Sequence, residues 1–204
     1  MKLDKQILII LGAVYAPVVI LLGFIGLHNS TAIYTRDPQS LGNLPSYAGL
    51  LSNIGIILWS TAVAIAIFTA FLVTEKQLFL LQAGALSALL GLDDVFQLHD
   101  VVLPNNGVPK KLGLTILGIL IVVFLIRWRT MIRDTSWPIL ALAIASFAIW
   151  AIVGAGTGAF EGRGFLQSSY KFVGIVGWVT WVVLQSYRAV RPAPPVNKRL
   201  TSPI

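Results

Sequence analysis

Long apolar runs separated by short polar stretches make up most of the chain. A helix needs about 20 apolar residues to cross a bilayer. Six runs reach or approach that length: Ile7–Leu27, Gly49–Val73, Gln77–Leu98, Leu112–Ile126, Trp137–Phe160 and Phe172–Tyr187. The fourth and sixth runs are the shortest, so we expect the cations beside them to belong to these helices or to extend toward the lipid headgroups. The pattern predicts an all-α, polytopic transmembrane bundle with six spans.

The composition supports a membrane protein. Of the 204 residues, 56 % are hydrophobic and 11 % are charged, and the mean hydropathy is +0.83, whereas about a quarter of the residues in a soluble domain are charged. The net charge of +7 does not form a basic stripe with interleaved aromatic residues, so we expect the lipid bilayer and no nucleic acid as partner. The chain has no cysteine, which excludes disulfides and thiolate chemistry.

The cations of the connecting segments fall unevenly on the two sides of the predicted membrane. With a cytoplasmic N-terminus, one side receives ten of them: Lys2, Lys5, Lys76, Arg127, Arg129, Arg133, Arg188, Arg191, Lys198 and Arg199. The other side receives five: Arg36, Lys110, Lys111, Arg163 and Lys171. Because cytoplasmic segments are rich in Lys and Arg, we expect both termini in the cytoplasm. Residues 1–190 then form the six-helix domain, and residues 191–204 form a proline-rich cytoplasmic tail, in a plasma or photosynthetic membrane.

The same topology gathers most of the acidic residues and both histidines on the outer side. The segment Leu92–Asp100 alone contains three carboxylates and one histidine, in a chain with eight acidic residues. Ionisable groups beside hydrocarbon cost several kcal/mol unless they are paired, hydrated or bound to a ligand. This segment is therefore the candidate site.

One interpretation of the site is a buried polar network. On a regular helix Asp93, Gln97 and Asp100 share one face with Gln82, and His99 lies on the opposite flank. Lys171 would pair with Asp93 or Asp94, and Arg163 would pair with Glu161 or Asp100. The members of this predicted network are Gln82, Asp93, Asp94, Gln97, Arg163 and Lys171.

Two other interpretations of the same residues remain open. Carboxylates with imidazole suit a divalent metal such as Zn, Mn or Fe, and the candidate ligands are His28, Asp94, His99, Asp100 and Glu161. The chain has no His-Glu-x-x-His and no Glu-x-x-His pair of the kind used by known metal sites. A proton or cation relay through Gln82, Asp93, Gln97 and Asp100 needs less geometry, since close carboxylates raise one another's pKa.

Two further features concern packing and partners. Gly154 and Gly158 have the spacing that lets a neighbouring helix approach closely, so other membrane subunits are possible partners at this face and at the C-terminal tail. Trp178 and Trp181 lie within the last apolar run, where core packing is the default interpretation and a groove for a pigment or lipid is the alternative.

Two segments resemble those of small bacterial multi-spanning membrane proteins of uncharacterised function. The first is Leu92–Asp100, followed by Pro104 and Gly107, and the second is Lys171–Trp178. The resemblance implies that the third and sixth helices act together. More remotely similar is the ceramidase and adiponectin-receptor superfamily, membrane hydrolases with seven helices and a zinc site of Ser, Asp and three His. The six spans and two histidines of this chain depart from that pattern.

We favour a non-catalytic membrane subunit or binding protein whose outward-facing acidic and histidine site holds a cation or a partner. The short connections and the missing catalytic spacings support this hypothesis. The alternatives are a metal-dependent lipid hydrolase of the outer leaflet and a proton or ion carrier.

Overall fold

A computed structural model describes residues 5–27, 49–155 and 162–191 of the chain. All regular structure in these residues is helical, which confirms the all-α class for this part of the chain. The elements are α1 (Lys5–Gly26), α3 (Leu50–Leu72), α4 (Gln77–Phe96), the π-helical turn η2 (Leu98–Val102), α5 (Leu103–Asn105), α6 (Lys110–Arg127), α7 (Arg129–Arg133), α8 (Trp137–Ala155) and α9 (Arg163–Val190).

The lengths and compositions of these helices are those of a membrane protein. Four of them, α3, α4, α8 and α9, are long and apolar enough to cross a bilayer. A shorter apolar helical stretch, Leu11–Gly26, lies within α1. In α6, Lys110, Lys111 and Arg127 belong to the helix itself, which is one of the two arrangements expected for the cations beside this short run.

The last helix begins earlier than the hydropathy pattern predicts. The structure starts α9 at Arg163, whereas the apolar run starts at Phe172. The intervening segment alternates polar residues such as Gln167 and Lys171 with apolar ones, so its mean hydropathy is low although it is helical. The expected tail and the segment from 156 to 160 of the fifth predicted span lie outside the described residues.

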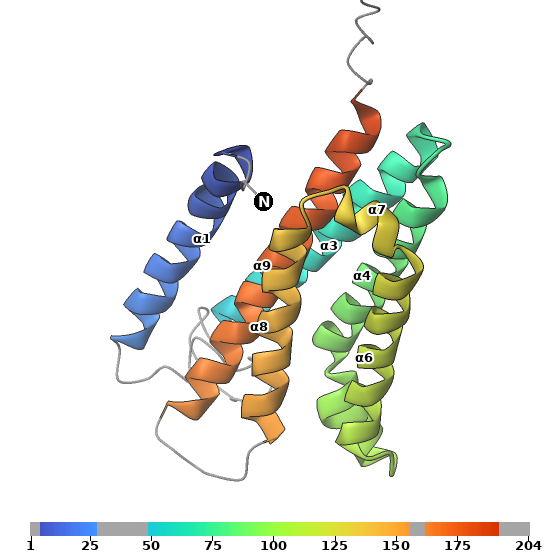
Figure 1. Ribbon diagram of the computed structural model, residues 1–204. Coiled ribbons are helices and arrows are strands. Elements are labelled where there is room, and N and C mark those ends of the chain that lie inside the picture. The colour runs from blue at the N-terminus through green and yellow to red at the C-terminus, as the bar shows by residue number, and fades with distance from the viewer. Residues whose placement is uncertain (1–4, 28–48, 156–161, 192–204) are drawn as a thin grey trace, which may run out of the picture.

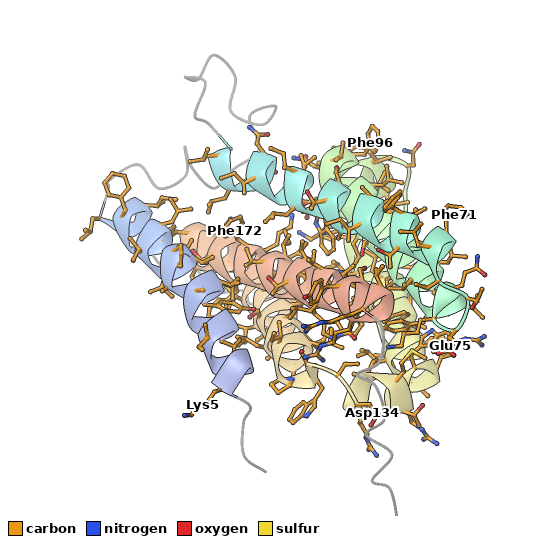
Figure 2. The ribbon with its side chains drawn as sticks, turned by 90° about the horizontal axis from the view of Figure 1, so that it is seen from above. Lys5, Phe71, Glu75, Phe96, Asp134 and Phe172 are labelled. Atoms are coloured by element: carbon orange, nitrogen blue, oxygen red, sulfur yellow. The ribbon has the colours of Figure 1, made fainter. Side chains whose placement is uncertain are left out.

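Helix α9 lies at the centre of the bundle. It packs along α8 and α3, α3 packs along α4, and α1 lies at the periphery with a lighter contact to α9. Figure 1 shows α8 and α9 running side by side, and Figure 2, the view from above, shows α9 between α1 and α3. Small residues allow close approaches between these helices: a Cβ at Gly91 of α4 would lie 2.9 Å from Trp59 Cβ of α3, and one at Gly174 of α9 would lie 2.7 Å from the Phe147 ring of α8.

Aromatic side chains fill the middle of the bundle. Trp178 and Trp181 are fully buried, with their ring centroids 5.8 Å apart, and both rings also pack against Phe124. The Trp178 indole donates a hydrogen bond of 2.9 Å to Ser87 Oγ. Core packing, the default interpretation, is therefore what these two tryptophans do.

The up-and-down course of the helices separates two ends of the bundle. The start of α1, the end of α9, the α3–α4 connection and α7 lie at one end, and η2, α5 and the start of α9 lie at the other (Figure 1). The segment Leu92–Asp100 is thus at the end opposite the first and last described residues.

Candidate functional site

The candidate site is built where α4 is interrupted. The helix ends at Phe96, and Gln97 takes a left-handed conformation with φ of 49° and ψ of 43°. The N–H groups of Asp100, Val101 and Val102 then donate to the Gln97 carbonyl, which forms the π-helical turn η2. The regular α-helical pattern of α4 therefore does not continue past Gln97.

The interruption brings His99 back onto Asp93. The His99 backbone N–H donates to Asp93 Oδ1 at 3.0 Å, and His99 Nδ1 lies 2.5 Å from Asp93 Oδ2. The regular helix assumed from the sequence, with Asp93, Gln97 and Asp100 on one stripe and His99 on the opposite flank, is therefore not what the structure shows. The physical reason is the left-handed conformation of Gln97. It could not be predicted, because no glycine or proline stands at this position.

The neighbouring carboxylate, Asp94, contacts a different helix. Lys171 Nζ of α9 donates to Asp94 Oδ1, which ties α4 to α9. The other oxygen, Asp94 Oδ2, is buried and accepts no hydrogen bond within the described residues. Its neighbour on α3 is Gly55, where a Cβ would lie 3.7 Å away. One strong acceptor of a buried carboxylate is thus left without a donor.

His99 also joins a chain of charges that reaches the surface. His99 Nε2 lies 3.2 Å from Asp100 Oδ2, in a geometry that makes no hydrogen bond, and Asp100 pairs with Lys110 at the start of α6. Burial lowers the pKa of His99, but the Asp100 and Asp93 carboxylates outweigh it and raise the pKa to about 9. The His99 and Lys110 cations hold the pKa of Asp100 below its usual range, although burial opposes this.

These groups line a polar cavity of about 180 Å³. Its walls come from α3, α4, η2, α8 and α9, and its polar lining residues are Ser52, Asp93, Asp94, Gln97, His99, Asp100, Gln167, Ser168 and Lys171. The Trp150 ring meets the His99 ring edge to face, with centroids 5.7 Å apart. The cavity therefore presents buried charges and hydrogen-bonding groups to whatever enters it.

The structure brings together four members of the predicted polar network and leaves two elsewhere. Asp93, Asp94, Gln97 and Lys171 all line the cavity. Gln82 accepts a 2.8 Å hydrogen bond from Trp128 Nε1 instead, about 16 Å along α4 from Asp93 at 1.5 Å per residue.

Arg163 is engaged at the start of α9 rather than in the cavity. Its guanidinium donates to the carbonyls of Val153 and Gly154 at 3.0 Å each, joining α9 to the end of α8. The predicted pairing partner Glu161 lies outside the described residues. Gly154 itself accommodates Gln167, whose Nε2 would be 2.5 Å from an added Cβ, so this glycine serves packing within the chain.

The predicted metal ligands are only partly described. His28 and Glu161, like Gly158 of the glycine pair, fall outside the described ranges. Over residues 5–27, 49–155 and 162–191, no three His, Asp or Glu side chains are grouped as metal ligands. Asp94 is instead paired with Lys171, His99 with Asp93, and Asp100 with Lys110.

Several contributors to the cavity were missed from the sequence, among them Ser52, Ser168, Gln167 and Trp150. Gln167 and Trp150 line it from α9 and α8. Gln167 could have been found from the alternation of polar and apolar residues before Phe172, which is typical of a helix with one face toward a polar interior. Trp150 carries no such signal, because an aromatic residue within an apolar run is normally core.

Comparison with known proteins identifies a family but no characterised relative. The sequence profile of a domain of unknown function, DUF8692, matches residues 8–184. No curated protein matches the chain. No solved structure matches it either. The expected membership of an uncharacterised family is confirmed, while the bacterial origin and the remote similarity to ceramidases stay predictions.

Proposed function

Because the chain belongs to the DUF8692 family, whose description assigns no function, we propose from the site itself that this is a membrane-embedded binding protein. The ligand presents a hydrogen-bonding polar group to Asp93, Asp94, His99 and Lys171. One observation carries the proposal: a polar cavity is lined by buried carboxylates, and one of them, Asp94, has an oxygen, Oδ2, without a donor. A buried acceptor left unsatisfied costs about 1–3 kcal/mol, so a ligand that donates to it gains that much relative to an empty site.

The charges in contact with one another favour a neutral ligand group over a bare cation. Asp93, Asp94 and Asp100 are in contact with His99, Lys171 and Lys110. The Asp100 and Asp93 carboxylates raise the pKa of His99 to about 9 against the effect of its burial, so three carboxylates face three basic side chains. A hydroxyl or amide group fits this balance, because it can donate to Asp94 while accepting from a Lys171 N–H.

The two alternative functions have less support. A metal-dependent hydrolase needs His28 and Glu161 to complete its ligand set, and two carboxylates of the site, Asp94 and Asp100, are already paired with lysines. A relay that starts at Gln82 would have to begin at a side chain that is bonded to Trp128. Binding without catalysis accounts for the paired charges and the open acceptor together.

We place this site in the outer leaflet of a plasma or photosynthetic membrane. In this topology six helices cross the bilayer and both chain ends are cytoplasmic. Support comes from the described cations at the two ends of the bundle. Seven lie at the end with the start of α1: Lys5, Lys76, Arg127, Arg129, Arg133, Arg188 and Arg191. Four lie at the site end: Lys110, Lys111, Arg163 and Lys171. The richer end is cytoplasmic by the positive-inside rule.

Native mass spectrometry of the protein purified in mild detergent tests the proposal. We expect a co-purified small-molecule adduct on the wild type that is lost in Asp94→Asn and in Ser52→Leu, which fills the cavity without breaking an ion pair. Asp134→Asn, the same chemical change at an exposed position, keeps the adduct. A wild type without any adduct, or an adduct that survives both cavity variants, would overturn the proposal.

A further inference from the structure

A second cavity begins where the polar cavity ends. It has a volume of about 270 Å³ and lies between α4, α6 and α8. Most of its wall is aliphatic or aromatic, for example Leu114, Leu117 and Ile121 of α6 and Ile144 and Phe147 of α8. Asp93, Asp94, His99, Trp150 and Lys171 line both cavities. The charged cluster therefore stands between a polar chamber and an apolar one.

The apolar cavity has its mouth on the outer surface of the helices. Helix α6 makes its substantial contacts with η2, α4, α5 and α7, and α8 makes its own with α9. Between α6 and α8, the cavity wall includes the exposed residues Gly118, Val122 and Ala148. Nothing lies within 4 Å of a Cβ placed at Gly118. In a bilayer this mouth of small side chains faces the lipid chains, because the neighbouring surface of α6 is apolar, with Ile119 and Val123 exposed.

Resting on the proposed function, we infer that the ligand is a neutral single-chain amphiphile with a hydroxyl head, taken from the bilayer between α6 and α8. Its hydroxyl donates to Asp94 Oδ2 and accepts from Lys171, and its chain occupies the apolar cavity. The volume, near the lower end for small-molecule sites, suits a single chain. A charged head is disfavoured because it would add an uncompensated charge to a balanced cluster whose inner members, Asp93, Asp94 and His99, are buried.

In this arrangement the head group of the ligand determines its affinity for the site. A hydrocarbon chain gains little on moving from lipid tails to an apolar cavity, because both surroundings are equally apolar. The hydrogen bonds to Asp94 and Lys171 are available only in the site. Selectivity among single-chain lipids of equal length therefore follows the head group, which is a property that competition can measure.

Photolabelling with a long-chain alcohol that carries a diazirine in mid-chain tests the inference. In vesicles that contain the protein, we expect labels on the peptides of α6 and α8 that contain residues 114–122 and 144–151. Excess hexadecanol should remove the labels, whereas equal concentrations of hexadecyl phosphate or hexadecyltrimethylammonium should not. Labelling of Gly118→Trp should fall about ten-fold or more, as overfilling a site costs its occupant.

Gly12→Trp is the matched control, because Gly12 is exposed on α1 with nothing within 4 Å of an added Cβ; its labelling should equal that of the wild type. Labels spread equally over α1, labelling unchanged in Gly118→Trp, or equal competition by the charged lipids would overturn the inference. If the native adduct depends on Asp94 but the alcohol does not label α6 and α8, the inference fails and the proposed function stands. Loss of both signals from the wild type would reject both.

Discussion

We expect Asp94 and Lys171 to stabilise the fold more as a pair than either residue does alone. Asp94 is 6 % exposed, and its partner joins α9 to α4 across the wall of the polar cavity. Removing one member of a buried pair leaves the other charge uncompensated, which costs about 3–5 kcal/mol. The Lys171 side chain keeps 31 % of its exposure, so the cost here falls toward the lower end of that range.

A double-mutant cycle measures this coupling. Asp94→Asn and Lys171→Gln should each lower the unfolding temperature in detergent, and the double variant should lose less than the sum of the two. Coupling of about 1 kcal/mol or more is expected for residues in direct contact. Asp134→Asn, at an exposed position, should leave the unfolding temperature unchanged. Additive losses in the double variant would show that the pair does not hold α4 to α9.

His99 gives the fold a dependence on pH. Its pKa of about 9 in the folded chain exceeds the ordinary value of 6.5, so protonated His99 stabilises the fold. That contribution is complete below about pH 6.5 and is lost as the pH rises through about 9. We expect the unfolding temperature to fall between pH 6.5 and 9, and expect His99→Gln to remove most of this slope. A wild-type curve that is flat over this range, or equal slopes in both proteins, would contradict the assignment.

At the scale of single residues, the sequence predicted which residues gather at the site. It did not predict all of the contacts that they make there. The unusual density of charge at Asp93–Asp100 located the site, and Lys171 was a predicted partner because it is a cation at the same end of the bundle. The contact between His99 and Asp93 could not be predicted, since residues six apart on a regular α-helix lie far apart on its surface. The hydrogen bond between Gln82 and Trp128 and the contact of Arg163 with the end of α8 likewise depend on how the helices pack.

At the scale of elements, the end of α4 determines the site. Gln97 is the one non-glycine residue with positive φ in the part of the chain that the structure describes, and a left-handed conformation costs an L-residue about 1–2 kcal/mol. Gln97→Gly should therefore raise the free energy of unfolding by up to about 1 kcal/mol. Gln97→Val, β-branched at the same position, should lower it.

The control for this prediction is the preceding residue. Phe96 is the last residue of α4 and is exposed, so glycine there has no strain to relieve. Phe96→Gly should lower stability, as glycine does at helical positions. Chemical unfolding of the purified proteins, followed by circular dichroism, measures both effects. Equal losses for Gln97→Gly and Phe96→Gly would mean that Gln97 is not strained.

Hydropathy predicted the existence of the main helices and not all of their ends. Each apolar run contains a helix, because backbone groups in lipid must be satisfied within the segment. Hydropathy could not predict the start of α9, because this segment is amphipathic. It could not predict the η2 turn either, because that turn depends on a strained glutamine. Both deviations occur at the polar cavity, where polar side chains and irregular backbone are tolerated away from lipid.

At the scale of the whole molecule, the two ends of the bundle should be accessible from opposite sides of the membrane. The chain has no cysteine, so single-cysteine variants need no prior substitution. Asn105→Cys, at the site end, should react with a membrane-impermeant maleimide on intact cells. Asp134→Cys, at the other end, should react only after permeabilisation. The reverse pattern would invert the proposed orientation, and labelling of both from outside would reject the spanning arrangement between α5 and α7.

The pairing of acids and bases in the polar cavity has an electrical consequence. The free energy of a unit charge changes by about 2.3 kcal/mol per 100 mV when it crosses the full membrane potential. The contacting groups at the site sum to zero, and a hydroxyl lipid that enters sideways from the bilayer brings no charge with it. Occupancy of this protein should therefore be the same in polarised and depolarised membranes, and a change of voltage should neither load nor empty it.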